Sequence, residues 1–177
     1  KQLKDKAASM ERRRLAKTGM LRSAHMLGNE EEIIFAATDL LADTKLAPEL
    51  SNEAHYYRAK AYLDAGKTDG AMEDLKVLAK DTRNVYGAEA KYKVAQIYFD
   101  GGQTDKAEQE VLNYIEVSTP HTYWLARSFV LLADVYMKLG RNLDAKQYLL
   151  SLKQNYQADD DIAGMIESRL EKLKTEN

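Results

Sequence analysis

Histidines and clustered carboxylates are the residues of this sequence whose chemistry could support catalysis or metal binding. The three histidines are His25, His55 and His121, and none belongs to an H-E-x-x-H motif or to another metal-ligand spacing. We therefore predict that they lie on the surface or in a binding groove. Cysteine is absent, which excludes disulfides, thiolate nucleophiles and cysteine-ligated metals from these residues.

Two acidic triplets, Glu30-Glu31-Glu32 and Asp159-Asp160-Asp161, raise the question of calcium. Neither has the alternating ligands and central glycine of a calcium-binding loop. Each stands where we expect a helix to begin, and negative charge there complements the helix dipole. Capping therefore explains both triplets better than metal binding does, and we predict no metal and no cofactor.

A short basic run, Arg12-Arg13-Arg14, could contact an acidic partner or nucleic acid. Glu11 precedes it and the formal net charge of the chain is −2, so a solvated helix face is the favoured interpretation. We predict no nucleic-acid partner. The sequence also lacks a glycine-rich phosphate loop, a nucleophile elbow and a carboxylate pair in a supporting spacing, and we predict that this chain is not an enzyme.

The composition is typical of a mostly helical chain: of 177 residues, 45% are hydrophobic and 31% charged, with nine glycines and two prolines. No run approaches the roughly 18 apolar residues that a membrane span needs, so we predict no membrane insertion of this segment. No signal peptide is visible. The sequence begins at Lys1, inside an expected helix, and we interpret it as a fragment of a longer protein.

One pattern, A-x-x-Y-x-x-x-G-x-x-x-x-A, recurs three times and organises the chain. Its copies begin 36 and then 38 residues apart. They are Ala59, Tyr62, Gly66 and Ala71; Ala95, Tyr98, Gly102 and Ala107; and Ala133, Tyr136, Gly140 and Ala145. A degenerate fourth copy lies upstream, where Leu21, Ala24, Gly28 and Ile33 take the same places. Repeats at such a period indicate stacked supersecondary units that bury their apolar faces against one another.

The pattern describes a hairpin of two antiparallel helices. The first alanine and the tyrosine share one helix face, where the small residue lets a neighbouring helix approach closely. The glycine ends the first helix because it tolerates a left-handed backbone. Thr68, Thr104 and Asn142 follow as expected N-caps, and the second alanine lies at the crossing of the two helices.

The spacing predicts an all-α chain of eight or nine helices without a linker that divides domains. We prefer a helix break near Ser9; one helix from Gln2 to Leu27 is the alternative. Asn29 with Glu32 resembles a capping box, and Thr119-Pro120 resembles an N-cap followed by proline. Further helices are expected at about 29–42, 52–65, 69–80, 88–100, 105–117, 120–139, 143–156 and 159–174.

The repeated residues resemble the tetratricopeptide repeat, over roughly residues 10–156. The resemblance implies one domain over residues 1–177, an α-α superhelix built from antiparallel helix pairs. Its repeats would span about 10–47, 48–84, 85–119 and 120–157, and a capping helix about 159–174. In overall character the chain resembles bacterial tetratricopeptide proteins of the cell envelope, and we expect that location while the sequence itself leaves the compartment open.

The resemblance also implies a concave groove, lined by the first helix of each repeat, that binds a peptide or protein. Carried onto this sequence, the lining positions are Tyr56, Lys60, Leu63, Asp64, Tyr92, Gln96, Phe99, Asp100, Val130, Asp134 and Met137. The lysine and asparagine clamp of chaperone-binding members is largely missing. Tyr56, Tyr92 and Phe99 could anchor a partner or pack against the neighbouring repeat, and both interpretations stay open.

Three functions are compatible with the sequence. We favour a non-enzymatic scaffold that binds a peptide or protein in its concave face. The second is a structural spacer or self-association segment, whose ends would expose apolar side chains such as Leu3, Met10 and Leu27. The third places any catalytic activity elsewhere in a longer chain.

Overall fold

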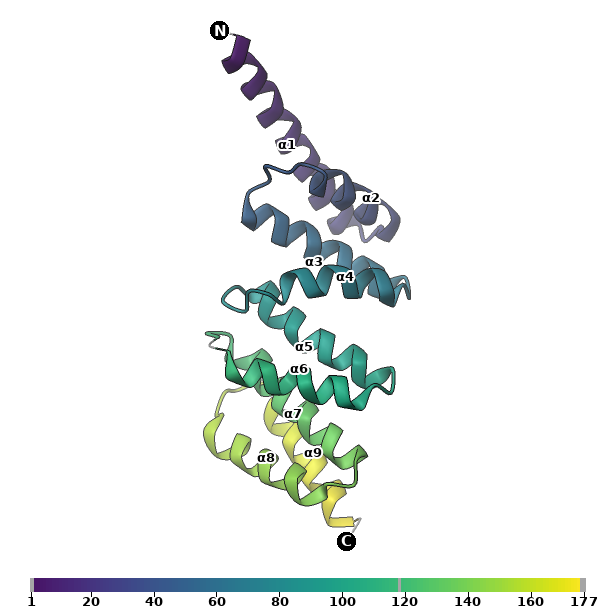
Figure 1. Cartoon of the computed structure of the whole chain (residues 1–177), viewed down its shortest axis with the longest axis vertical. Helices are drawn as coiled ribbons and strands as arrows, with labels where there is room; N and C mark the ends of the chain where they lie inside the picture. The colour runs from purple at the N-terminus through teal and green to yellow at the C-terminus, as the bar shows by residue number, and fades with distance from the viewer. Residues whose placement is uncertain (1, 118, 176–177) are drawn as a thin grey trace. The chain divides into compact units, whose positions relative to one another are not determined.

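Nine α-helices and no strand make up the described residues, 2–117 and 119–175, in the computed structural model (Figure 1). Side chains are described from residue 5 onwards, so Leu3 lies outside them. The predicted all-α fold is confirmed. The helices are α1 (Gln2–Leu27), α2 (Glu30–Leu41), α3 (Pro48–Asp64), α4 (Thr68–Leu78), α5 (Val85–Asp100), α6 (Thr104–Glu116), α7 (Thr122–Lys138), α8 (Asn142–Asn155) and α9 (Ile162–Thr175).

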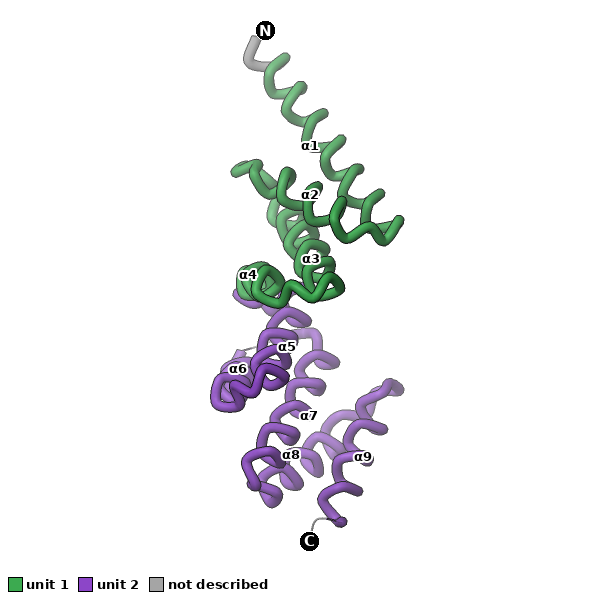
Figure 2. Tube along the Cα trace, turned by 90° about the vertical axis from the view of Figure 1, so that its right-hand side faces the viewer, with its two compact units in different colours: residues 1–78 green, residues 79–177 purple. Residues whose placement is uncertain are grey.

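The chain divides into two compact units, unit 1 with residues 1–78 and unit 2 with residues 79–177 (Figure 2). Unit 1 contains α1–α4 and unit 2 contains α5–α9. Within each unit, consecutive helices pack as hairpins: α1 with α2 and α3 with α4, then α5 with α6 and α7 with α8. One continuous domain over all 177 residues stays a prediction.

The pattern glycines end their helices as predicted. Gly28, Gly66, Gly102 and Gly140 all have a left-handed backbone, with φ between 66° and 75°. After α5, the Gly102 amide donates to the Phe99 carbonyl at 3.0 Å and the Gln103 amide donates to the Tyr98 carbonyl at 2.8 Å. This pair of bonds is a Schellman motif, in which the pattern tyrosine supplies the acceptor that closes the helix. The same two bonds recur at the other three turns.

The pattern alanines occupy equivalent buried sites at the hairpin crossings. Ala59, Ala95 and Ala133 are at most 1% exposed, and so are Ala71, Ala107 and Ala145. At the α3–α4 crossing a Cβ added to Gly70 would lie 3.1 Å from the Tyr62 ring, so the ring packs directly on the backbone of the second helix. Small residues therefore set the distance between the paired helices.

Several predicted helix starts differ from the structure. The preferred break at Ser9 is wrong: α1 is continuous, because Ser9 is an exposed residue inside a run of good helix formers. Thr68, Thr104 and Asn142 are the first residues of their helices, not N-caps. Gln103 and Arg141, which precede the last two, make no side-chain cap bond. The Asn29 cap is confirmed, since its side chain accepts from the Glu32 amide at 3.2 Å.

The helix expected after Thr119-Pro120 begins later, at Thr122. The Thr119 hydroxyl is used elsewhere: it donates to the Thr82 carbonyl at 2.8 Å and accepts from the His121 amide at 3.2 Å. Thr119 therefore closes a loop between the starts of α5 and α7. A side chain engaged in this way is not available as a helix cap.

Unit 2 ends in α9, which packs against both α7 and α8. Its stripe of Ile162, Ile166, Leu170 and Leu173 joins the core of this unit, as predicted for a capping helix. Unit 1 has its own core, formed by side chains of α1, α2 and α3 that include Leu21, Ile33, Ala37, Leu40 and Ala54.

Candidate partner-binding faces

In unit 1, α1 and α3 are the first helices of their hairpins, and together they form what we call the first-helix face of unit 1. Tyr56, Lys60, Leu63 and Asp64 of α3 were predicted to lie on it. Shifting these positions by the 38 residues that separate Gly66 from Gly28 adds their α1 equivalents. These are Thr18, Arg22, His25 and Met26. Thr18 is buried, so only the other three are open to a partner.

Ion pairing and ring stacking hold α1 and α3 together on this face. Arg22 donates to both oxygens of Glu53, at 2.7 Å from Nε and 2.8 Å from Nη2. The ring of His25 stacks on that of Tyr57, with centroids 3.9 Å apart. Tyr56 lies beside Tyr57, with their ring centroids 6.0 Å apart. The stacked rings of His25 and Tyr57 are thus ordered before any partner arrives, which lowers the entropy cost of binding.

The same face offers a partner both charge and apolar surface. Lys60 and Asp64 are exposed, and Lys60 makes no ion pair with any described residue. Met26 is exposed, while Tyr56 and Leu63 are half-buried. A half-buried tyrosine with a fixed ring is a common binding anchor, and the neighbouring charges can set the register of a bound segment.

In unit 2, Tyr92 lies in the core. Its side chain is 7% exposed and packs against Trp124 at 5.6 Å between centroids, and the Arg127 guanidinium lies 5.1 Å from its ring centroid. The Tyr92 hydroxyl donates to Gln96 Oε1 at 2.8 Å and accepts from Arg127 Nη2 at 3.2 Å. The packing alternative left open for Tyr92 is therefore the one observed.

Val130 and Asp134 of α7 are also engaged within unit 2. Val130 is buried, and Asp134 accepts from Arg169 of α9 at 2.8 and 2.7 Å. Helical periodicity places Arg169 mostly on the solvent side of the last helix, but the side chain turns back towards α7. Val130 and Asp134 thus serve internal contacts.

The remaining predicted positions of α5 and α7 form the first-helix face of unit 2. Gln96 donates to Asp100 Oδ1 at 2.8 Å, and Asp100 is exposed. Phe99 is half-buried, with Lys138 Nζ 5.1 Å from its ring centroid, and Met137 is half-buried as well. This face therefore repeats the combination found in unit 1: an aromatic side chain, an exposed carboxylate and a lysine.

The histidines have structural partners. His55 Nδ1 donates to Asp74 Oδ1 at 2.7 Å, and His121 Nε2 lies 3.0 Å from the Arg83 carbonyl oxygen. No group of three or more His, Cys, Asp or Glu side chains within the described residues could hold a metal ion. In the same residues, no helix is both long and apolar enough to cross a membrane.

The resolved pKa shifts all move away from neutral pH. Burial, with the nearby Tyr148, raises the pKa of Tyr136 to about 12. Burial opposes the charge on Arg127, yet hydrogen bonds to Tyr123 and Tyr92 raise its pKa overall. Burial alone would raise the pKa of Asp74. Hydrogen bonds from Arg58 and His55 outweigh this effect and hold the pKa of Asp74 below its usual value. General acid–base catalysis uses groups whose pKa is shifted towards the working pH, not away from it.

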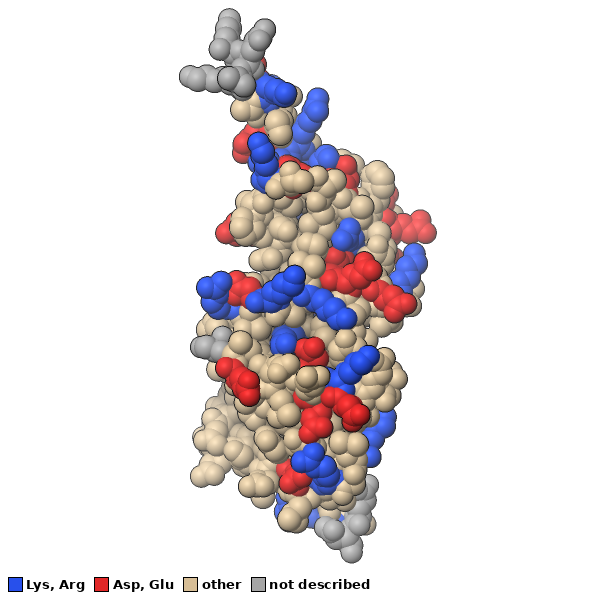
Figure 3. All heavy atoms as spheres, in the orientation of Figure 1, with Lys and Arg blue, Asp and Glu red and all other residues tan. Residues whose placement is uncertain are grey.

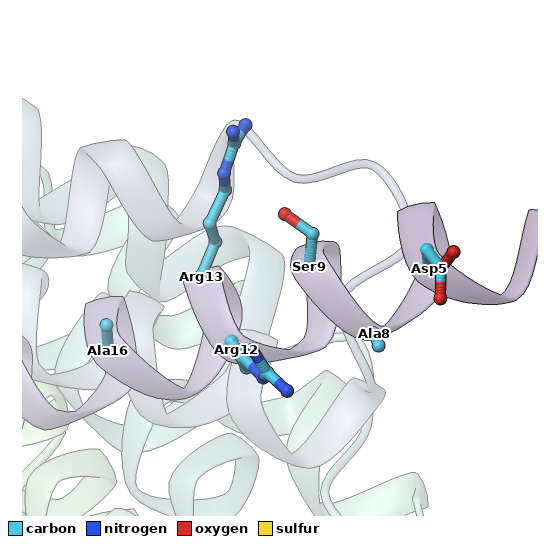
Figure 4. A pocket seen from close by; sticks show the side chains of 6 residues that line it. All are labelled: Asp5, Ala8, Ser9, Arg12, Arg13 and Ala16. Carbon is cyan, nitrogen blue, oxygen red and sulfur yellow. The ribbon is translucent and has the colours of Figure 1, made fainter. Parts of the chain in front are cut away.

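A hollow of about 420 Å³ lies along the first half of α1 (Figure 4). Its lining residues, Asp5, Ala8, Ser9, Arg12, Arg13 and Ala16, all belong to this one helix, so no second element completes a site. Arg12 and Arg13 are exposed, as expected for a solvated face, whereas Arg14 is half-buried and pairs with Asp43 at 2.9 Å. On the view of Figure 3, basic and acidic side chains are interspersed over both units.

Comparison with known proteins supports one repeat by its sequence and the fold of most of the chain by its structure. Residues 53–81 match the family model described as tetratricopeptide repeat, so the predicted resemblance is confirmed. A crystal structure of Podosopora anserina putative kinesin light chain nearly identical TPR-like repeats is 16% identical, has a TM-score of 0.55 and covers 92% of this chain and 94% of its own. A variant of those repeats is also 16% identical, with a TM-score of 0.57. It covers 92% of this chain and 93% of its own.

These likenesses show the fold: the chain is an all-helical protein of tetratricopeptide-like repeats. No curated protein matches the sequence. Repeats of this class generally mediate protein–protein interactions and generally act as non-enzymatic scaffolds.

Proposed function

We propose that this chain is a non-enzymatic interaction module that binds a peptide or protein segment on its first-helix faces. On unit 1, Tyr56 acts as the anchor, and the exposed charges of Lys60 and Asp64 fix the register of a segment bound there. On unit 2, Phe99 and the exposed Asp100 have the same two roles. The family resemblance suggested such a function, and the repeat class supports it at the coarse level.

The observation that carries the proposal is the preorganised first-helix face of unit 1. Arg22 of α1 pairs with Glu53 of α3, His25 stacks on Tyr57, and the Tyr56 ring lies beside that of Tyr57. Lys60 lies one helical turn beyond Tyr56 and is exposed. An aromatic anchor next to an available cation suits a segment that carries an apolar residue close to a carboxylate.

Site-specific photo-cross-linking tests this proposal while the partner is still unidentified. A photoreactive amino acid at Lys60 should give discrete cross-linked products in cells that naturally make the protein. Val77, an exposed residue of α4, is the matched control, because it lies on the second helix of the same hairpin. Equal products from both positions, or none from Lys60, would refute binding on the first-helix face.

A further inference from the structure

An exposed aromatic ring on unit 1 belongs to α2, which is the second helix of its hairpin and not a first helix. Phe35 of α2 is 68% exposed, and Leu27 at the end of α1 is 76% exposed. Glu31 and Glu32 precede Phe35 by four and three residues, so they lie on the same side of α2. Neither glutamate makes an ion pair with any described residue. We call Glu31, Glu32 and Phe35 the acidic ridge.

A groove of about 230 Å³ on unit 2 has the opposite character. It lies between α8 and α9, where Leu150, Leu170 and Leu173 form an apolar floor. Leu150 is 47% exposed, so part of the floor is open to solvent. Lys146, Lys153 and Lys174 line the rim together with a single acidic residue, Glu167. We call these residues the basic groove.

The cations of the basic groove are accessible. Lys146 makes no ion pair with the described residues of either unit. Lys153 pairs with Glu167, and Lys174 pairs with Glu171 at 2.9 Å, but all four side chains are more than half exposed. Exposed pairs of this kind are weak and can exchange partners. An acidic partner can therefore approach the rim without breaking a buried interaction.

The two surfaces match in size and in charge. A cavity of about 150 Å³ lined by leucine and similar side chains is known to accept benzene, so a groove of about 230 Å³ has room for one phenyl ring. With the Phe35 ring on the leucine floor, Glu31 and Glu32 would face the lysine rim. Burial of the ring supplies affinity, and the opposite charges fix the orientation.

We infer that a second copy of this chain docks its acidic ridge into the basic groove. The contact is heterologous, since one surface of a copy meets a different surface of the next. Each copy carries both surfaces, so association can continue beyond a dimer unless the geometry closes a ring. The inference is independent of the proposed function, because it uses no residue of the first-helix faces.

Charge reversal tests the contact. Sedimentation velocity over a range of concentrations should show association of the unmodified chain. Glu31→Lys with Glu32→Lys in one variant, and Lys146→Glu with Lys153→Glu in another, should each weaken association about tenfold or more. An equimolar mixture of the two variants should associate again, because opposite charges are then restored across the contact.

Two further variants separate this contact from general effects. Phe35→Ala removes only an exposed ring, so it should abolish association while helicity by circular dichroism stays unchanged. Lys80→Glu reverses an exposed charge outside both surfaces and should leave association unaffected. A chain that stays monomeric at all concentrations, or a mixture of reversed variants that fails to associate, would overturn the inference.

Discussion

Arg169 of α9 donates two hydrogen bonds to Asp134 of α7, at 2.8 Å from Nε and 2.7 Å from Nη2. Asp134 is one of the positions at which the family resemblance implied a partner, and in this chain the capping helix supplies the contact itself. The two side chains are only 22% and 23% exposed. This pair therefore helps to hold α9 on α7, in addition to the apolar stripe of α9.

The energy of the Arg169–Asp134 pair can be measured with a double-mutant cycle. We expect Arg169→Ala and Asp134→Ala each to destabilise unit 2, and the coupling energy between them to be about 1 kcal/mol, because both groups remain partly solvated. Urea unfolding of the two single variants, the double variant and the parent gives this value. Additive effects of the two substitutions would show that the observed geometry contributes nothing to stability.

A second prediction concerns Asp74, which is 2% exposed in unit 1. Its carboxylate accepts from Arg58 Nε at 2.9 Å and Nη2 at 2.8 Å, as well as from His55, while Arg58 Nη1 also donates to Thr38 at 2.9 Å. Asp74→Asn should destabilise the protein by about 3 kcal/mol, because it leaves the half-buried Arg58 without its counter-charge. Asp64→Asn, at an exposed position, should change stability by less than about 0.5 kcal/mol.

The pH dependence of stability follows from the same carboxylate. The pKa of Asp74 is lowered in the folded chain, so the folded state binds this proton less readily than the unfolded state does. Its stabilising contribution is present above the unfolded pKa of about 3.9 and disappears as the pH falls through the lower folded value. The stability difference between the parent and Asp74→Asn should therefore shrink below about pH 4. A difference independent of pH would contradict a depressed pKa.

Substitution by alanine should change the stability of the protein in opposite directions at two glycines, one inside α1 and one directly after it. Apart from the adjacent backbone, no described atom lies within 4 Å of a Cβ added at either glycine, so packing does not distinguish them. Gly28 has φ +66°, and Gly28→Ala should cost about 1 kcal/mol because an alanine is strained there. Gly19 lies inside the helix, and Gly19→Ala should add up to about 1 kcal/mol of stability. Thermal unfolding of both variants measures the contrast, and shifts of the same sign would refute it.

The repeat pattern was sufficient to predict the hairpins because its residues act locally and at the crossing. Gly102 ends a helix through its own backbone, and Ala95 and Ala107 are both buried within the same hairpin. The pattern is less informative at Ser9, where a residue able to cap a helix instead lies within one. A serine can either cap a helix or lie inside one. The residues on both sides of Ser9 favour helix, so the helix continues through it.

Burial within the candidate site could not be predicted from register alone. Helical periodicity places Tyr92 and Gln96 on one side of α5, but the depth of Tyr92 depends on Trp124 and Arg127, which α7 brings against it. Likewise, Asp134 is engaged only because Arg169 reaches it from α9. Such contacts join residues that lie a whole repeat apart, and the spacing within one repeat contains no information about them.

The affinity of a cross-linked partner segment tests the central claim most directly. Once that segment has been identified and synthesised, isothermal titration should compare the unmodified chain with a Tyr56→Ala, Lys60→Glu variant. We predict binding at least about tenfold weaker, with unchanged helicity, because the variant loses an aromatic anchor and reverses the neighbouring charge. Equal affinity of the two chains would contradict binding on the first-helix face of unit 1.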